Sequence, residues 1–153
     1  MVAANHHATL VVVRDQGVLI RGPSGAGKSS LALALIEAGA RRGWFSRLVA
    51  DDQVFLQNYH GRLIGWAPQP LRGLMEMPPL GPVPQAHEAR AQVDWVVDLV
   101  PAEHLPRMIA EEVIRLADVP LPLLKLPQRS TEPAVTPLLK ILDDKDLPGN
   151  LPV

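Results

Sequence analysis

The feature that most constrains this chain is the stretch GVLIRGPSGAGKSSLALALIEAGARR, from Gly17 to Arg42. An apolar, β-branched run leads into a glycine-rich turn, and a lysine then opens a run of helix-forming residues. The turn fits the spacing G-x-x-x-x-G-K-[S/T] from Gly22 to Ser29. Because this spacing places a loop between a strand and a helix, it favours an α/β fold with a ligand at the N-terminus of that helix.

The residues of this turn are suited to hold a phosphate chain. Its glycines permit positive φ, and the backbone N–H groups around them can converge on phosphate oxygens. Lys28 is predicted to neutralise the β- and γ-phosphates of a nucleotide, and the Ser29 hydroxyl to ligate Mg²⁺. A glycine turn before an ordinary helix is the alternative, but the flanking strand and helix patterns favour phosphate binding. The predicted phosphate-binding residues are Gly22, Pro23, Ser24, Gly25, Ala26, Gly27, Lys28, Ser29 and Ser30.

Phosphoryl transfer also needs a carboxylate for the metal and a group that orients or deprotonates the acceptor. Asp51 and Asp52 end the apolar run RLVADD, so one of them can hold the metal or its water while the other takes a hydroxyl proton. The alternative is that these two aspartates only start a turn. Glu76 in LMEM is ambiguous on spacing alone, and Asp98 in WVVDL more readily caps the segment after its strand.

Composition bounds the class of protein. The chain has 153 residues, 47% of them hydrophobic and 20% charged, which is enough for one domain with a single core. Its net charge of −1 implies neither a nucleic-acid partner nor a polybasic membrane patch. It has no cysteine, shows no signal peptide at its start and contains no apolar run near the roughly 20 residues of a membrane span. We therefore expect a cytoplasmic, single-domain protein over residues 1–153.

Periodicity predicts a three-layer α/β arrangement with some antiparallel pairing. Strands are predicted at Ala8–Arg14 and Val18–Gly22, as a hairpin around the turn Asp15–Gly17, followed by a helix from Lys28 to about Gly39. Later elements are predicted at Arg47–Gln57 (a strand interrupted by the aspartates), Gly61–Pro68 (a strand), Val93–Val100 (a buried strand) and Glu103–Asp118 (a helix broken early by Pro106). The 16 prolines concentrate after Pro68, so we expect weak order from about Gln128 to Val153.

The motifs together resemble the catalytic domain of the HPr kinase/phosphorylase family, bacterial serine kinases that act on the phosphocarrier HPr. That domain opens with a histidine, a strand and a hairpin that leads into the phosphate loop, the order found in HATLVVVRDQGVLIRGPSGAGKSS from His7 onward. The stretches LVADD, LIGWAPQPLRGLMEMPPLGPV and VVDLVPAEHLPRM then follow in the family's order. The resemblance runs from about Asn5 to Leu126. It implies a P-loop kinase fold of the HPr kinase/PEP carboxykinase-like type, a mixed β-sheet with flanking helices.

The resemblance also implies roles for single residues. Asp52 matches the position of the family's catalytic base, with Asp51 beside it, and His7 matches a histidine that would tune or orient this proton acceptor. Arg107 falls on the family's catalytic arginine, where a planar cation would stabilise the charge of the transferring phosphate. The implied Mg²⁺ ligands are Ser29, Glu76 and Asp52. A frayed terminus at His7 and a solvated helix position at Arg107 are the alternatives.

By the same resemblance, the chain is expected to be an ATP- and Mg²⁺-dependent serine kinase whose partner is an HPr-like phosphocarrier protein. A homo-oligomer is implied, a hexamer in the family. The family's amino-terminal domain has no counterpart in these residues, so we expect a short, catalytic-domain-only form such as those of α-proteobacteria. These bacteria often lack a sugar-transporting phosphotransferase system, which implies a regulatory phosphotransfer role.

Two departures from the family pattern bear on activity. The catalytic-loop pattern E-x-R-G-L-G here reads EMPPLG, so a stiff Pro78-Pro79 pair replaces arginine and glycine. The segment tied to dephosphorylation, K-P-G-R-N, faces QRSTEPA and does not match. We therefore expect little phosphorylase activity.

Two other functions stay open. The first is a nucleotide-binding regulator with weak or no kinase activity. The second is a small-metabolite kinase of the nucleoside-monophosphate-kinase type. That type usually has a lid rich in arginines, whereas here the arginines after Gly61 are scattered along the sequence.

Overall fold

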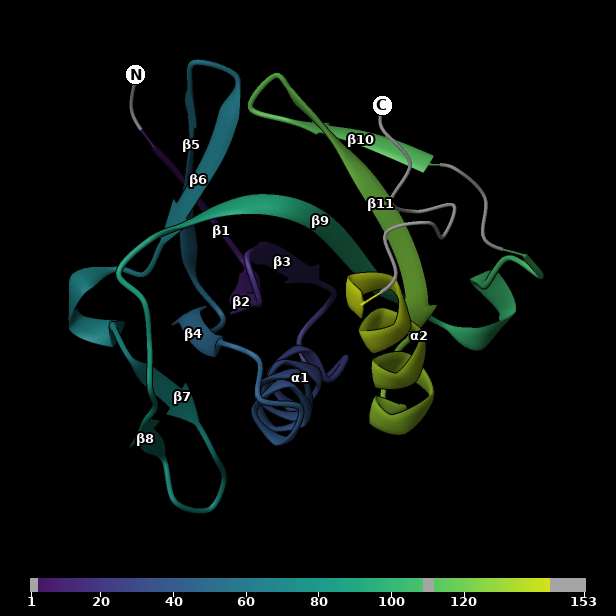
Figure 1. Ribbon diagram of the computed structural model, residues 1–153, viewed down its shortest axis with the longest axis horizontal. Helices are drawn as coiled ribbons and strands as arrows, with labels where there is room; N and C mark the ends of the chain where they lie inside the picture. Colours follow the sequence, from purple (N-terminus) through teal and green to yellow (C-terminus); the bar gives the residue numbers. More distant parts are fainter. Residues whose placement is uncertain (1–2, 109–111, 144–153) are drawn as a thin grey trace.

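The structure, a computed structural model, describes residues 3–108 and 112–143, whose strands and helices are labelled in Figure 1. The strands are β1 (Ala4–His6), β2 (Ala8–Val13), β3 (Gln16–Arg21), β4 (Ser46–Ala50), β5 (Val54–Tyr59), β6 (Arg62–Trp66), β7 (Leu74–Glu76), β8 (Pro82–Pro84), β9 (Ala91–Val100), β10 (Glu112–Leu116) and β11 (Val119–Pro127). The helices are α1 (Lys28–Arg41) and α2 (Thr131–Asp143), with single 3₁₀ turns at Gln69–Leu71 and Ala102–His104.

A mixed sheet forms the body of the described chain. Its order is β1-β5-β6-β9-β3-β2-β4, with β11 also beside β9 and β10 outside β11. The pairs β3–β9 and β9–β11 are parallel, and the remaining pairs are antiparallel. The predicted first hairpin is confirmed, although its tight turn lies at Arg14 and Asp15, where Arg14 has φ 61°. The predicted strands around the aspartates, after Gly61 and at Val93–Val100 are confirmed as well.

The central strands are buried on both faces, so each contributes side chains to two cores. Val18 and Ile20 of β3 pack in the core under the helices, while Leu19 packs in the opposite core. Both helices of the described chain lie side by side on one face: α1 lies below β2, β3 and β4 in Figure 1, and α2 lies next to α1 and beside β11. The other face is covered by β5, β6 and β10, because the long strand β9 curls over that face and pairs with β6, which holds β5, and with β11, which holds β10. The mixed α/β arrangement is thus confirmed, with strands rather than helices as the third layer.

Helix α1 continues past the predicted end at Gly39 and stops at Arg41. The residue that ends it is Gly43, which has φ +74° and donates its N–H to the Ala40 carbonyl oxygen at 3.0 Å. Gly39 serves packing instead, since a Cβ at this position would lie 2.0 Å from Ser46 Oγ. The glycine therefore marks the close approach of α1 to β4 rather than the end of the helix.

The helix predicted for Glu103–Asp118 is wrong. Within the described residues of this stretch, a 3₁₀ turn at Ala102–His104 is followed by strand β10, which pairs with β11 through a turn at Ala117 (φ 48°) and Asp118 (φ 64°). The prolines of β11 do not prevent this pairing. Pro120 and Pro122 precede Leu123, the first residue of β11 that pairs with β9, so these two prolines cost no hydrogen bond to β9, and Pro127 lies opposite Val100 at the last position of the strand.

The weak order predicted from Gln128 is wrong as far as Asp143, because helix α2 spans Thr131–Asp143. Its apolar residues Leu138, Ile141 and Leu142 are spaced three and four residues apart, so they lie on one face of the helix, and they are almost fully buried against the core. Full burial of each is worth about 1.5–3 kcal/mol, which together exceeds the roughly 3 kcal/mol cost of Pro137 inside the helix. Residues 144–153 lie outside the described part of the chain.

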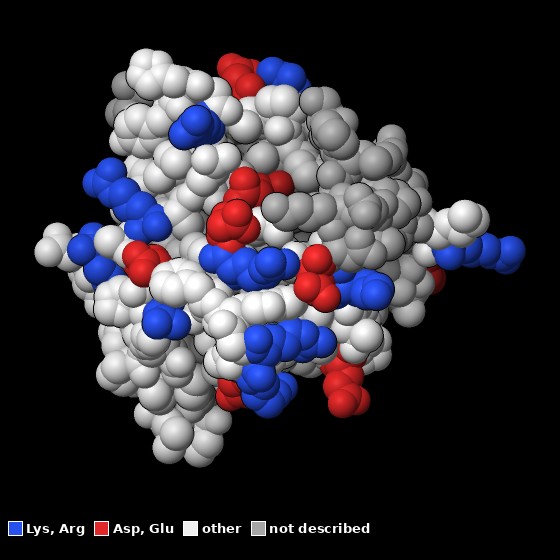
Figure 2. All heavy atoms as spheres, viewed as in Figure 1, with Lys and Arg blue, Asp and Glu red and all other residues white. Residues whose placement is uncertain are grey.

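The surface carries mixed charge. On the face drawn in Figure 2, Lys and Arg side chains are interspersed with Asp and Glu. No helix among residues 3–108 and 112–143 is both long and apolar enough to cross a membrane.

Candidate functional site

The glycine-rich loop lies between the end of β3 and the start of α1. Gly25 and Gly27 have φ 81° and 98°, in the left-handed region that glycine tolerates without strain. The loop closes on itself through the Ala26 N–H, which donates to the Pro23 carbonyl oxygen at 3.0 Å. Gly27 is the N-cap of α1 and has no side chain to cap it, so the first N–H groups of the helix are left for a ligand.

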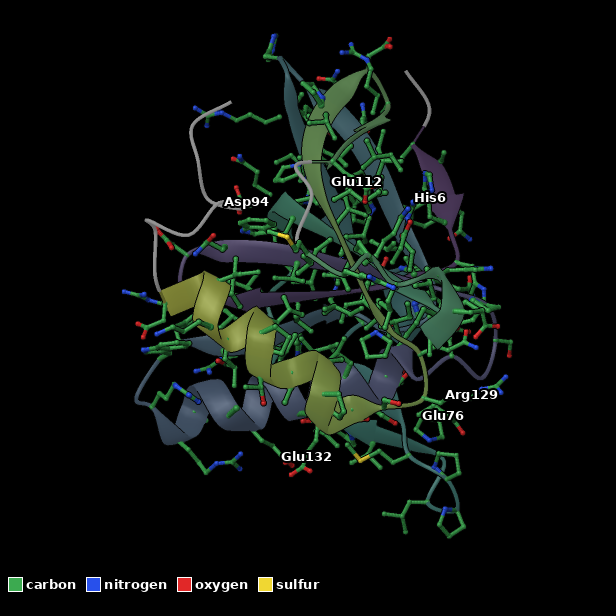
Figure 3. The ribbon with its side chains drawn as sticks, turned by 90° about the vertical axis from the view of Figure 1, so that its right-hand side faces the viewer. His6, Glu76, Asp94, Glu112, Arg129 and Glu132 are labelled. Atoms are coloured by element: carbon green, nitrogen blue, oxygen red, sulfur yellow. The ribbon has the colours of Figure 1, made fainter. Side chains whose placement is uncertain are left out.

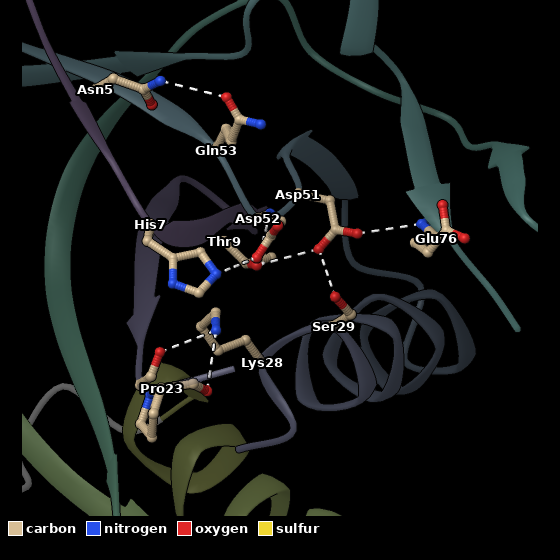
Figure 4. A network of polar contacts seen from close by, with 11 residues as sticks. Asn5, His7, Thr9, Pro23, Lys28, Ser29, Asp51, Asp52, Gln53 and Glu76 are labelled. Atoms are coloured by element: carbon tan, nitrogen blue, oxygen red, sulfur yellow. Dashed lines mark hydrogen bonds and ion pairs between the residues drawn. The ribbon is translucent and has the colours of Figure 1, made fainter. Parts of the chain in front are cut away.

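Lys28 curls back over this loop. Its Nζ donates to the carbonyl oxygens of Gly22 at 2.9 Å and Pro23 at 3.3 Å, and the residue is only 6% exposed (Figure 4). These weak neutral acceptors hold the ammonium at the mouth of the loop, where a phosphate oxygen would be a stronger partner.

A salt bridge fixes the strand ends beside the loop. Arg21, which precedes Gly22, donates from Nε and Nη2 to the two carboxylate oxygens of Asp98 at 2.7 and 2.8 Å. This bidentate pair ties the end of β3 to β9, so Asp98 does not cap the next segment as the sequence suggested. Burial lowers the pKa of nearby His6, and the positive charge of Arg21 lowers it further.

Asp51 accepts hydrogen bonds from three elements. Its Oδ1 receives Ser29 Oγ at 2.6 Å and Thr9 Oγ1 at 3.1 Å, and its Oδ2 receives the Glu76 N–H at 3.2 Å (Figure 4). The residue is 7% exposed. The carboxylate is thus held rigidly beside the first turn of α1, where it meets the hydroxyl that the sequence assigns to the metal.

Asp52 points away from that cluster toward His7. Its Oδ1 lies 2.5 Å from His7 Nε2, and the two side chains are 58% and 49% exposed. Asp52 has φ 66°, a left-handed conformation uncommon for a residue with a side chain. The neighbouring aspartates therefore diverge, one buried against Ser29 and the other open to solvent beside a histidine.

Two cavities meet at these carboxylates. One, of about 400 Å³, is lined by the loop residues Ser24, Gly25, Gly27, Lys28, Ser29 and Ser30 together with Asp51, Asp52, Glu76 and Pro78. The other, of about 350 Å³, is lined by Asp51, Asp52, Gln53, Leu71, Leu74, Glu76 and Pro82. Asp51, Asp52 and Glu76 form the wall that the two cavities share.

Glu76 is the last residue of β7, and it is exposed. Its backbone N–H, rather than its side chain, donates the hydrogen bond to Asp51. Arg107 is not brought to this wall. It lines a separate cavity of about 140 Å³ with Pro106, Met108 and Pro137, so the site gathers the other predicted residues without it.

The structure adds two residues that the sequence interpretation missed. Thr9 is fully buried in β2 and bridges the aspartates. Arg129 donates its backbone N–H to the Ala26 carbonyl oxygen at 2.8 Å and its Nε to the Gly25 carbonyl oxygen at 3.1 Å. In Figure 3, Arg129 lies toward the same end of the molecule as Glu76 and far from Asp94. Thr9 could have been found from sequence, because it is the only hydroxyl residue in the apolar run ATLVVV and follows His7 by two positions. No sequence pattern pointed to Arg129.

The oxygens present suit Mg²⁺ bound together with a nucleotide. A serine hydroxyl and a rigid carboxylate are hard oxygen donors, and Mg²⁺ commonly takes few protein ligands and completes its shell with phosphate and water. Across residues 3–108 and 112–143, no three His, Asp or Glu side chains cluster closely enough to hold a metal ion by themselves.

Comparisons with known proteins identify the family of this chain. Residues 2–131 match the family model described as the HPr serine kinase C-terminal domain. The HPr kinase/phosphorylase of Lactobacillus acidophilus is 34% identical over 133 residues, which cover 79% of this chain and 39% of that protein. That of Geobacillus kaustophilus is 36% identical over 135 residues, covering 80% and 42%.

The fold also matches a solved structure, that of the Hpr(Ser) kinase/phosphatase from Coxiella burnetii. The TM-score is 0.76 at 23% identity, over 92% of this chain and 88% of that one. This likeness shows a shared fold. The chain spans about two-fifths of the length of the two curated relatives above.

Proposed function

Because the chain belongs to the HPr serine kinase C-terminal domain family, we propose that it is an ATP- and Mg²⁺-dependent kinase that phosphorylates a serine of an HPr-like phosphocarrier protein. The observation that carries the proposal is the pair of cavities with Asp51 and Asp52 in the wall between them. A site that only binds a nucleotide needs the first cavity, whereas a transferase needs a donor and an acceptor on opposite sides of the reacting group.

The loop cavity is assigned to the donor. Backbone N–H groups of the loop and of the first turn of α1 bind the phosphates, and Lys28 exchanges its carbonyl partners for phosphate oxygens. Ser29 and Asp51 would hold Mg²⁺, and Glu76 and Asp52 are the further ligands implied by the family resemblance. When bound, Mg²⁺ offsets the negative charge of the phosphates during transfer.

The second cavity is assigned to the acceptor. A serine hydroxyl entering past Leu71 and Leu74 reaches Asp52, which takes the hydroxyl proton as the serine oxygen bonds to the γ-phosphorus and the bond to ADP breaks. His7 contacts Asp52 and holds its carboxylate toward the acceptor. The role of Arg107 in this step stays a prediction.

Further parts of the proposal follow from the resemblance. We infer a P-loop kinase fold, a homo-oligomeric assembly, a cytoplasmic location and little phosphorylase activity, the last because the K-P-G-R-N pattern is absent from the sequence. The test of the kinase activity is incubation of the protein with Mg²⁺, γ-labelled ATP and the cognate HPr-like protein. We expect label that survives hydroxylamine and acid, as a phosphoserine does. No serine-bound label with a correctly folded acceptor would reject the kinase function.

A nucleotide-binding regulator is the second candidate, and one observation favours it. Pro78 lines the donor cavity at the position where the family pattern has arginine, so a cation is missing from that wall. Tight Mg·ATP binding without turnover would support the regulator, and Pro78→Arg together with Pro79→Gly would then raise the rate of transfer. If the wild-type protein already transfers phosphate to serine at an enzymatic rate, the regulator is excluded.

A further inference from the structure

The hydroxyl of Thr9 lies between the two aspartates. Thr9 Oγ1 donates to Asp51 Oδ1 at 3.1 Å and accepts the backbone N–H of Asp52 at 3.2 Å. Thr9 is 0% exposed, although it stands in a strand whose other residues are apolar. A buried hydroxyl is tolerated only when it is hydrogen-bonded, and this one uses both its donor and its acceptor on the candidate site.

The direction of these two hydrogen bonds is fixed by chemistry. The N–H of Asp52 can only donate and the carboxylate of Asp51 can only accept, so the Thr9 hydroxyl has a single orientation that satisfies both. Thr9 thereby links the backbone of one aspartate to the side chain of the other.

The backbone conformation of Asp52 is what this link stabilises. The positive φ of Asp52 turns the backbone after β4, so that the side chain of Asp51 points toward Ser29 and that of Asp52 points toward His7. Such a conformation persists only where surrounding contacts hold it. The Gln53 N–H closes the turn on the Asp51 carbonyl oxygen at 2.8 Å, and the Thr9 hydroxyl anchors the turn to β2.

We propose that Thr9 is a positioning residue for phosphoryl transfer: its hydroxyl sets the divergence of Asp51, on the metal side, from Asp52, on the acceptor side. The inference rests on the proposed function and deepens it. Thr9 does not reach the reacting atoms itself, and it acts through the two carboxylates. It is required for the catalytic step and not for holding the nucleotide, because the loop and Lys28 bind the phosphates, and Ser29 and the Glu76 N–H still hold Asp51 on the metal side when the Thr9 hydroxyl is lost.

The test compares Thr9→Val, which keeps the β-branched shape and loses the hydroxyl, with Thr9→Ser, which keeps the hydroxyl. For Thr9→Val we expect kcat to fall about 10- to 100-fold while the dissociation constant of Mg·ATP changes by less than about threefold, as a small misplacement of catalytic groups predicts. Thr9→Ser should stay within about threefold of the wild type in both. Equal kcat in Thr9→Val and wild type, or equal losses in the Val and Ser variants, would overturn the proposal.

Hydrogen exchange at the Asp52 amide gives a readout that needs no activity. The amide should be protected in the wild type and in Thr9→Ser, and should lose that protection in Thr9→Val. If the Asp52 amide of the wild type exchanges as fast as an unprotected amide, the proposal is overturned even when Thr9→Val does not fold. If the wild type transfers no phosphate but its Asp52 amide is protected through the Thr9 hydroxyl, the proposed function fails and the link between the aspartates stands.

Discussion

Replacing Asp52 by asparagine separates catalysis from binding more cleanly than any other single change at this site. Asparagine has the same shape as aspartate and is one of the few residues that tolerate a left-handed backbone, so the turn at φ 66° is preserved. The substitution removes the charge and with it the ability to take a proton from the acceptor. An alanine here would confound that loss with backbone strain.

The expected effects differ greatly in size. Asp52 and His7 are 58% and 49% exposed, so their pair contributes at most about 1 kcal/mol to stability. For a chain of this length that corresponds to a Tm change of no more than about 4 °C. Loss of a general base lowers kcat by about 10²- to 10⁴-fold, or roughly 3–5 kcal/mol in the activation barrier. The dissociation constant of Mg·ATP should change by less than about threefold, because Lys28, the loop, Ser29 and Asp51 are untouched and the amide oxygen of asparagine can still ligate the metal.

The assay is transfer of labelled phosphate to the cognate HPr-like protein, with calorimetric titration of Mg·ATP on the same samples. Asp118→Asn is the matched control, since Asp118 also has a positive φ (64°) but lies in the exposed turn between β10 and β11. If Asp52→Asn keeps more than about a tenth of the wild-type kcat, Asp52 is not the base. Equal losses in both variants would mean that the effect comes from the backbone.

Three further predictions concern stability and the loop. Gly39→Ala should lower the free energy of unfolding by about 1–3 kcal/mol despite the better helix propensity of alanine, because its Cβ would lie 2.0 Å from Ser46 Oγ. Adding Ser46→Ala should recover most of this loss in urea denaturation, and no recovery would refute the contact. Burial raises the pKa of the Asp94 carboxyl group, so the folded state binds its proton more tightly than the unfolded chain and loses stability as the pH rises above the usual pKa of an aspartate. The free energy of unfolding of Asp94→Asn, relative to that of the wild type, should therefore be more favourable at pH 7 than at acidic pH. A difference between the two proteins that does not change with pH would contradict this. Arg129→Ala should weaken Mg·ATP binding about three- to tenfold in calorimetry by freeing the phosphate loop, whereas Arg115→Ala, which removes a comparable bond in the β10–β11 turn, should leave it unchanged.

The part of the fold that the sequence predicts well is the part determined by local patterns. The hairpin Ala8–Arg21, the loop and the start of α1 each follow from residues within a few positions of one another. The pair Asp51–Asp52 was also found from sequence, as a polar end to an apolar strand. The contacts that separate the two side chains, Asp51 with Ser29 and Thr9 and Asp52 with His7, did not follow from local patterns, because their partners are distant in sequence.

The incorrect predictions share a different cause, which is that tertiary pairing outweighed local preference. The stretch EEVIRLAD has a helical spacing of apolar residues, but Val113 and Ile114 pair with β11 instead. The prolines after Gln128 suggested weak order, whereas the buried leucines of α2 outweigh the cost of Pro137. Arg129 could not be identified from sequence, because its contacts with the loop depend on where β11 ends beside Gly25.

The most direct test of the proposed phosphoryl-transfer site is a crystal structure of the protein with Mg²⁺ and a non-hydrolysable ATP analogue. We predict that the triphosphate follows the loop from Gly22 to Ser29, with the metal beside Ser29 and Asp51. The terminal phosphate should face Asp52 with room for one hydroxyl oxygen between them. A triphosphate bound outside this cavity, or a terminal phosphate that points away from Asp52, would rule out this site for phosphoryl transfer.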